Sequence, residues 1–189
     1  MITVLRQAHI PSGTSPEALY RALDLQYPKF FKMDLLSRLG FLLGEKLLAG
    51  DPDRFTPRED RAVLLFSRNG CYCNDRQYAA SMEEYPSPAL FVYTLPNIVT
   101  GELAIRNKYA GESSAFVLEA FDPQAIVACI EQAFQDRVTR SALCGWVDCR
   151  SENDYDALAF LLERDGGGKP FNTDFLYGIF DQRNQAEAD

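Results

Sequence analysis

Leucines set the strongest pattern of apolar and polar positions in this chain. One leucine every four residues predicts an amphipathic helix from about residue 32 to residue 48, with one side turned toward a core. Gly50-Asp51-Pro52 is expected to end it. The repeat consists of Leu35, Leu39, Leu43 and Leu47, flanked by Leu36 and Leu42.

Shorter apolar runs and turn residues place the other elements. Residues 61–66 (RAVLLF) are a continuous apolar run, typical of a central strand covered on both faces. Ser15-Pro16-Glu17 and Asp122-Pro123 each pair a capping side chain with a proline, which predicts helix starts. Residues 87–96 (SPALFVYTLP) are rich in proline and aromatic residues and are expected to be extended. Further strands are expected at residues 2–9, 113–119, 141–147 and 157–162, and further helices at 75–84, 97–109 and 122–136.

The order of these elements predicts the fold class. Strands and helices alternate up to the last two strands, which is typical of a layered α/β domain with a mostly parallel sheet. The last two strands have too short a connection for a parallel return, so they are expected to pair antiparallel and make the sheet mixed. We expect about five strands flanked by helices in one domain, residues 1–164. Residues 165–189 are expected to be a partly flexible tail, frayed after Gln182.

Composition narrows the classes of function. The chain has 189 residues, a hydrophobic fraction of 47% and a formal net charge of -8. This acidic balance argues against binding to nucleic acid or to an anionic membrane surface. No signal-peptide pattern is visible, and no apolar run approaches the length of a membrane span. The odd number of cysteines, five, favours free thiols and a cytoplasmic location.

The junction between the strand at 113–119 and the helix after it is the first candidate site. Turns of this kind hold nucleophiles in many α/β enzymes, because the helix N-terminus stabilises negative charge. Here the turn, Glu119-Ala120-Phe121-Asp122-Pro123, contains neither cysteine nor serine. Asp122 is interpreted as a helix cap in preference to a catalytic base.

The remaining reactive residues have less specific patterns. The spacing of Cys71 and Cys73 does not fit a zinc site, and buried or incidental thiols are the preferred interpretation of these two and of Cys129, Cys144 and Cys149. We expect no metal and no cofactor. The only histidine, His9, would have to serve alone in any catalytic site. Gly166-Gly167-Gly168-Lys169 lacks the spacing of a phosphate-binding loop and predicts a turn. The acidic residues 148–156 predict a solvated loop.

The central part of the chain resembles the β-ketoacyl-acyl-carrier-protein synthases of the thiolase superfamily. The segment SPALFVYTLPNIVTGELAIRNKYAGESSAFVLEAFD resembles that family's helix, Gly-Pro-Ser turn, strand and nucleophile elbow. KFFKMDLLSRLGFLLGEKLL, ALCGWVDC and YDALAFLLER resemble neighbouring helix and strand segments, so the resemblance covers about residues 2–164. It points to the N-terminal half of the fold and to the ketosynthase-like proteins of aryl polyene or flexirubin clusters. Matching positions are Pro96, Asn97, Gly101, Ala104, Gly111 and Ser113.

Departures from the family decide what the resemblance implies for activity. The family's nucleophilic cysteine would fall at Ala120, and its two catalytic histidines belong to a second half that this sequence does not contain. The 3-oxoacyl synthase reaction of the family would therefore lack its thiolate and its imidazoles. We expect no catalytic residue in the family's positions.

These observations lead to a hypothesis and several alternatives. The resemblance implies a non-catalytic partner or regulatory subunit in fatty acid or polyketide-type biosynthesis, either a homodimer or a heterodimer with a full-length ketosynthase. The partner strand would be Ser113, Ser114, Ala115, Phe116, Val117, Leu118 and Glu119.

One alternative is a module that binds acyl chains or acyl carrier protein. It would require a basic patch made from Lys29, Lys32, Arg38, Arg106 and Lys108. Another is a small acyltransferase or thioesterase with a relocated nucleophile, Cys73 or Cys149. A decaying gene fragment is the last, and the intact helix caps and strand patterning argue against it.

Overall fold

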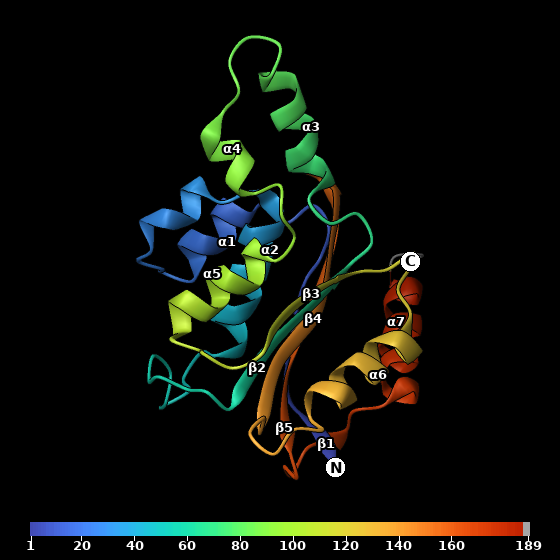
Figure 1. The fold of residues 1–189 in the computed structure, drawn as a ribbon. Coiled ribbons are helices and arrows are strands. Elements are labelled where there is room, and N and C mark those ends of the chain that lie inside the picture. The colour runs from blue at the N-terminus through green and yellow to red at the C-terminus, as the bar shows by residue number, and fades with distance from the viewer. Residues whose placement is uncertain (187–189) are drawn as a thin grey trace.

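A mixed sheet between two helical layers forms the molecule (Figure 1). The computed structural model describes residues 1–186, with side chains described as far as residue 180. None of the described helices combines the length and the apolar character needed to cross a membrane. In chain order the elements are β1 (Ile2–Ile10), α1 (Pro16–Ala22), the 3₁₀ turn η1 (Pro28–Lys32), α2 (Leu35–Leu47), β2 (Arg61–Ser67), α3 (Tyr72–Ser81), α4 (Pro88–Val92), α5 (Ile98–Asn107), β3 (Ser113–Val117), α6 (Pro123–Ala133), β4 (Ser141–Ser151), β5 (Asp154–Arg164), β6 (Lys169–Pro170) and α7 (Thr173–Ala186).

The sheet confirms the predicted mixed α/β class and adds a strand. Within residues 1–186 it has six strands in the order β3-β2-β4-β5-β1-β6. β2 pairs in parallel with β3 and with β4, whereas β4–β5, β5–β1 and β1–β6 are antiparallel. Parallel pairing is therefore confined to the two sides of β2. β4 and β5 form a hairpin, as their short connection predicts.

Two buried clusters cover the two faces of the sheet. α1, α2 and α5 lie on one face and α6 and α7 on the other (Figure 1). β2 contributes to both clusters, since Val63 and Leu65 face α2 while Ala62, Leu64 and Phe66 face α6. This double burial explains why residues 61–66 show no alternation of apolar and polar positions.

Helix caps follow the sequence signals. Ser15 caps α1 through the N–H of Ala18, and Pro16 occupies the first turn. In α2 the cap is Asp34, which accepts from the N–H of Ser37, so the helix starts three residues later than the leucine pattern predicts. Each cap satisfies an N–H group in the first turn that has no partner within its own helix.

The segment expected to be extended, residues 87–96, contains a short helix instead. Ser87 accepts a hydrogen bond from the N–H of Leu90, and Pro88 sits in the first turn, so the proline starts α4 and does not break it. α3 and α4 project beyond the two layers as an arm (Figure 1), here called the α3–α4 arm, residues 72–95.

Residues after position 164 continue the fold. β6 pairs with β1, and Phe171 and Leu176 lie in the buried cluster on the α6 side. The predicted boundary after residue 164 therefore separates segments that share one sheet and one core. The predicted frayed end after Gln182 falls in a part whose side chains are not described, and residues 187–189 lie outside the described chain.

Two glycines let α2 approach α5 closely. A Cβ atom added at Gly44 would lie 2.6 Å from the Cδ2 atom of Leu103, and one added at Gly40 would overlap the side chain of Val99. Val99 and Leu103 are both buried. The glycine spacing of four residues thus leaves room on one side of α2 for the apolar side of α5.

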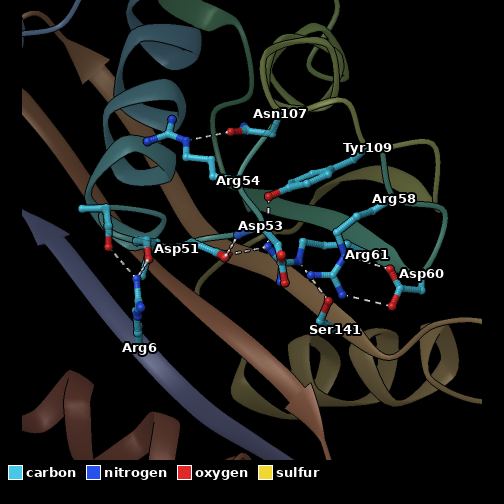
Figure 2. A network of polar contacts seen from close by, with 12 residues as sticks. Arg6, Asp51, Asp53, Arg54, Arg58, Asp60, Arg61, Asn107, Tyr109 and Ser141 are labelled. Carbon is cyan, nitrogen blue, oxygen red and sulfur yellow. Dashed lines mark hydrogen bonds and ion pairs between the residues drawn. The ribbon is translucent and has the colours of Figure 1, made fainter. Parts of the chain in front are cut away.

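A polar network fixes the start of β2 (Figure 2). Arg61 is buried, and its guanidinium donates to the hydroxyls of Ser141 at 2.9 Å and Tyr109 at 3.0 Å, and pairs with Asp51 at 3.3 Å. One cation therefore joins β2 and β4 to the loops after α2 and α5. Burial of this charge is offset by the several acceptors that surround it.

Gly40→Ala and Gly101→Ala should change stability in opposite directions. A methyl group at Gly40 meets Val99, so we expect a net loss of about 1–2 kcal/mol. Gly101 lies in α5 with nothing within 4 Å of an added Cβ, so alanine should stabilise by about 0.5–1 kcal/mol. Urea unfolding of the two variants measures both effects. Equal effects would contradict the close α2–α5 packing.

The stability contributed by Asp60 should disappear in acid. Two guanidinium nitrogens of Arg58 donate hydrogen bonds to the two carboxylate oxygens of Asp60, at 2.9 and 3.0 Å. These hydrogen bonds hold the pKa of Asp60 below its ordinary value of 3.8. A lowered pKa in the folded state means that the contribution is complete above about pH 3.8 and is lost as the pH falls through the folded value. Urea unfolding at a series of pH values should show Asp60→Asn losing less stability than wild type below that point. Parallel pH profiles would contradict this.

Candidate functional site

β3 forms one edge of the sheet. It pairs only with β2 among the described strands, in register from Val63–Ser113 to Ser67–Val117. The sequence predicts this strand as residues 113–119, but it ends at Val117, and Leu118 and Glu119 belong to the turn that follows. The exposed edge therefore has five residues.

Hydrogen bonds at the two ends of β3 show which backbone groups face outward. The carbonyl of Glu112 accepts from an N–H of β2 at 2.8 Å, and the N–H of Leu118 donates to the last carbonyl of β2 at 2.9 Å. Because residues alternate along a parallel ladder, even-numbered residues face β2. The N–H and C=O groups of Ser113, Ala115 and Val117 consequently point away from the sheet, where a further strand could pair with them.

Side chains hold β3 in place from both of its faces. Phe116 stacks on Phe66 with ring centroids 4.9 Å apart, and the hydroxyl of Ser113 donates to that of Thr100 at 2.8 Å. Val117, at the end of the strand, is 58% exposed. The strand is thus fixed in position while its outer edge and its last side chain remain accessible.

The turn after β3 contains the position where the family resemblance puts a nucleophile. Ala120 is exposed there, and a cavity of about 420 Å³ opens beside it. A methyl group offers no nucleophile and no general base to this cavity. Its lining consists of Arg68, Leu118, Glu119, Ala120 and Asp122.

Asp122 caps α6 and uses the N–H groups that an oxyanion site would need. Its carboxylate accepts from the N–H groups of Gln124 at 2.9 Å and Ala125 at 3.1 Å. Pro123, the next residue, has no N–H to offer. The first turn of α6 therefore binds a negative charge that the chain itself supplies.

Asp148 organises the turn after β2, a role that the sequence analysis did not assign. It is buried near the end of β4, and it accepts from the hydroxyl of Ser67 and the N–H of Arg68, both at 3.0 Å. Asn69 donates twice, through its N–H at 2.7 Å and its side-chain amide at 2.8 Å. The signal in the sequence was a lone carboxylate in an apolar strand, ALCGWVDC. The predicted solvated loop at 148–156 is instead the tip of the β4–β5 hairpin.

Two of the five cysteines, Cys73 and Cys149, contact each other. All five are free thiols, and Cys144 is fully buried within β4. Cys71 precedes α3 without forming a side-chain hydrogen bond to it, and Cys129 lies half-buried in α6. Cys73, in the first turn of α3, contacts Cys149 of β4, since its thiol donates to the Cys149 carbonyl with a sulfur–oxygen distance of 3.5 Å.

The basic residues proposed as a patch are largely neutralised by carboxylates. Lys29 pairs with Glu102 at 2.8 Å, and Arg106 pairs with Glu45 at 3.0 Å. Arg38 forms an ion pair with Glu17. Lys32 in η1 and Lys108 at the end of α5 complete the set. These pairs remove much of the positive potential that docking of an acidic carrier protein would use.

The other candidates from the sequence lie apart from the turn at Ala120. The Nε2 atom of His9, on β1, lies 3.9 Å from the Oδ1 atom of Asp156, on the neighbouring strand β5. The run Gly166–Gly168 forms the turn before β6, and the described residues contain no cluster of His, Cys, Asp and Glu that could hold a metal ion.

Comparisons with known proteins identify the fold. No protein-family model and no curated protein matches the chain. Solved ketosynthase structures do match, at identities that show a shared fold. The complex of the ketosynthase ApeO with its chain length factor ApeC from Xenorhabdus doucetiae gives a TM-score of 0.63 at 19% identity, over 88% of this chain and 80% of the matched chain.

Two further complexes give similar scores. The ishigamide ketosynthase/chain length factor gives a TM-score of 0.61 at 18% identity, over 72% of this chain and 45% of the matched one. AntDE:AntF is a type II polyketide synthase acyl-carrier protein in complex with its ketosynthase bound to the hexaketide. It gives a TM-score of 0.62 at 12% identity, over 87% of this chain and 62% of the matched chain. In these two cases the chain spans less than two thirds of the matched chain. The predicted ketosynthase half-domain is confirmed as the fold.

Asp148→Asn should destabilise the protein far more than Asp154→Asn. The amide would present an N–H₂ group to donors that now face a carboxylate, so we expect a loss of about 2–4 kcal/mol. Asp154 lies on the same hairpin but forms only an exposed ion pair with Arg150, so its substitution should cost about 0–1 kcal/mol. Urea unfolding at neutral pH compares the two variants. Similar losses would show that the turn after β2 does not depend on Asp148.

Proposed function

We propose that the protein is a non-catalytic, ketosynthase-like subunit that pairs through β3 with a full-length ketosynthase in fatty acid or polyketide-type biosynthesis. The observation that carries this proposal is the open edge of β3. The outward backbone groups of Ser113, Ala115 and Val117 are arranged to add a strand from another chain.

The turn at Ala120 supports a partner role over catalysis. A ketosynthase reaction needs a thiolate at the elbow and a site that stabilises negative charge on the reacting oxygen. Ala120 supplies no sulfur, and the carboxylate of Asp122 fills the helix N-terminus next to it. A subunit of this kind contributes a surface and leaves the chemistry to its partner.

Apolar side chains extend the β3 edge toward the α3–α4 arm. Gly70 lies between Val117 and the proline that follows the arm, because a Cβ built on it would contact Val117 at 3.5 Å and Pro96 at 3.4 Å. Soluble monomers seldom expose so many large apolar groups on one projection, and such surfaces commonly bind proteins. On the arm, about half or more of the residue is exposed at Tyr72, Met82, Tyr85, Phe91, Val92 and Leu95.

The comparisons are consistent with this proposal. The matched chain of the ApeO–ApeC complex is of similar length to this one, and that complex joins a ketosynthase to a chain length factor. Pairing with a second copy of this chain would use the same edge and is the alternative. Binding of an acyl carrier protein has less support, since Lys29, Arg38 and Arg106 are paired with carboxylates.

Val117→Lys should weaken pairing, whereas Val138→Lys should not. A lysine at the end of the open edge places a charge where a partner strand would bury an apolar side chain. Val138 is 57% exposed, nearly the same as Val117 at 58%, but lies in the loop after α6. We expect Val117→Lys to weaken the complex at least about tenfold, the effect of roughly 1.4 kcal/mol.

Analytical ultracentrifugation checks this with the protein alone and mixed with the full-length ketosynthase ApeO. A complex that forms only in the mixture supports the heterodimer, and a dimer of the protein alone supports the alternative. A monomer in both samples at tens of micromolar would overturn the proposal, as would equal binding by the two lysine variants.

A further inference from the structure

A second cavity, on the opposite face of the sheet from α6, is lined by Cys73, whose sulfur contacts the backbone carbonyl of Cys149 behind it. The cavity has a volume of about 370 Å³ and lies between the loop before α1, the start of α2, the first turns of α3 and the β4–β5 turn. Cys73 lines it and is half-buried, whereas Cys149 behind it is 1% exposed. A small molecule in the cavity can therefore reach one sulfur directly and the other only through the first.

The different surroundings of Cys73 and Cys149 make the two thiols chemically unequal. The neighbouring Cys149 lowers the pKa of Cys73, whereas the neighbouring Cys73, together with burial, raises the pKa of Cys149. Arg76 favours the Cys73 thiolate, while burial, Asp34 and Asp148 oppose it. The position of Cys73 in the first turn of α3 also favours a negative charge.

The other thiols of the described chain lack this combination of access and charge stabilisation. Burial raises the pKa of Cys71 to about 12, and burial raises the pKa of Cys144 further. Cys129, like Cys73, is half-buried, but burial raises its pKa.

We propose that Cys73 is a modification site for small disulfides, and that Cys149 resolves the product to an internal Cys73–Cys149 disulfide. In the first step the Cys73 thiolate attacks one sulfur of the disulfide R–S–S–R, forming a Cys73–S–S–R bond and releasing a thiolate that takes up a proton. In the second step Cys149 loses its proton and attacks the Cys73 sulfur, releasing the second R–S⁻. The protein loses two hydrogen atoms, and the disulfide is reduced to two thiols.

Charge around the cavity defines the class of reagent. Its lining includes the carboxylates of Glu17, Asp34 and Glu152, and its one lining cation among the described residues, Arg38, is paired with Glu17. This field favours a neutral or cationic disulfide over an anionic one. The internal bond would join the first turn of α3 to β4, at the base of the α3–α4 arm.

Exposure of the reduced protein to cystamine, followed by an acid quench and peptide mapping by mass spectrometry, tests the proposal. We expect a peptide linked through Cys73 and Cys149, formed faster with cystamine than with glutathione disulfide. In Cys149→Ala the reaction should stop at the mixed disulfide on Cys73. Cys129→Ser is the matched control and should behave as wild type.

A second measurement keeps the test independent of substitutions in the core. Limiting iodoacetamide on the reduced wild-type protein should label Cys73 severalfold faster than Cys129, because a lowered thiol pKa increases the fraction of reactive thiolate. Labelling of Cys129 ahead of Cys73, or a cystamine product without the Cys73–Cys149 link, would overturn the proposal.

Discussion

The carboxylate of Asp148 accepts four hydrogen bonds from Ser67, Arg68 and Asn69, and so fixes the turn that leaves the central strand. A buried carboxylate is costly unless donors surround it, and these donors come from one short segment whose conformation is thereby determined. Gly70, the next residue, adopts a positive φ of 53° and packs beside Val117. The same interaction thus positions the end of β3, the start of α3 and the neighbouring residue Cys149. Arg61 plays the corresponding part at the other end of β2, so the strand is anchored at both ends.

Local signals in the sequence predicted most of the elements. The leucine repeat gave α2, and Asp122-Pro123 gave the start of α6, because both depend on residues close in the chain. The sequence analysis did not predict α4, because the prolines around residues 87–96 indicate an extended segment. In the structure Ser87 and Pro88 together start the helix. β6 and α7 were missed for a different reason. Their short or weakly patterned segments are stabilised by β1 and the α6 face, which only the folded chain brings near.

The candidate site was partly accessible to the same reasoning. The family resemblance placed the nucleophile position at Ala120 and the partner strand at residues 113–119, but the local pattern of residues alone could not show that β3 lies at an edge, since strand order is a property of the whole sheet. Nor could it bring Cys73 to Cys149, which are separated by 76 positions. The ion pairs of Lys29, Arg38 and Arg106 were equally invisible, because each partner carboxylate comes from a different helix.

The placement of β1 between β5 and β6 has a consequence for how the chain is made. Ile2 pairs with Arg164 and Thr3 with Pro170, so β1 leaves the ribosome long before either of its partner strands. Until β5 emerges, the two edges of β1 are open, and the apolar residues that it contributes to both cores are uncovered. Pairing across such a sequence distance slows folding, because loop closure precedes any gain from contacts. During synthesis, α2 and β2 can form early, whereas β1 can join the sheet only after β5 has emerged. Chaperones that hold nascent chains would therefore find their longest-lived target in the N-terminal residues.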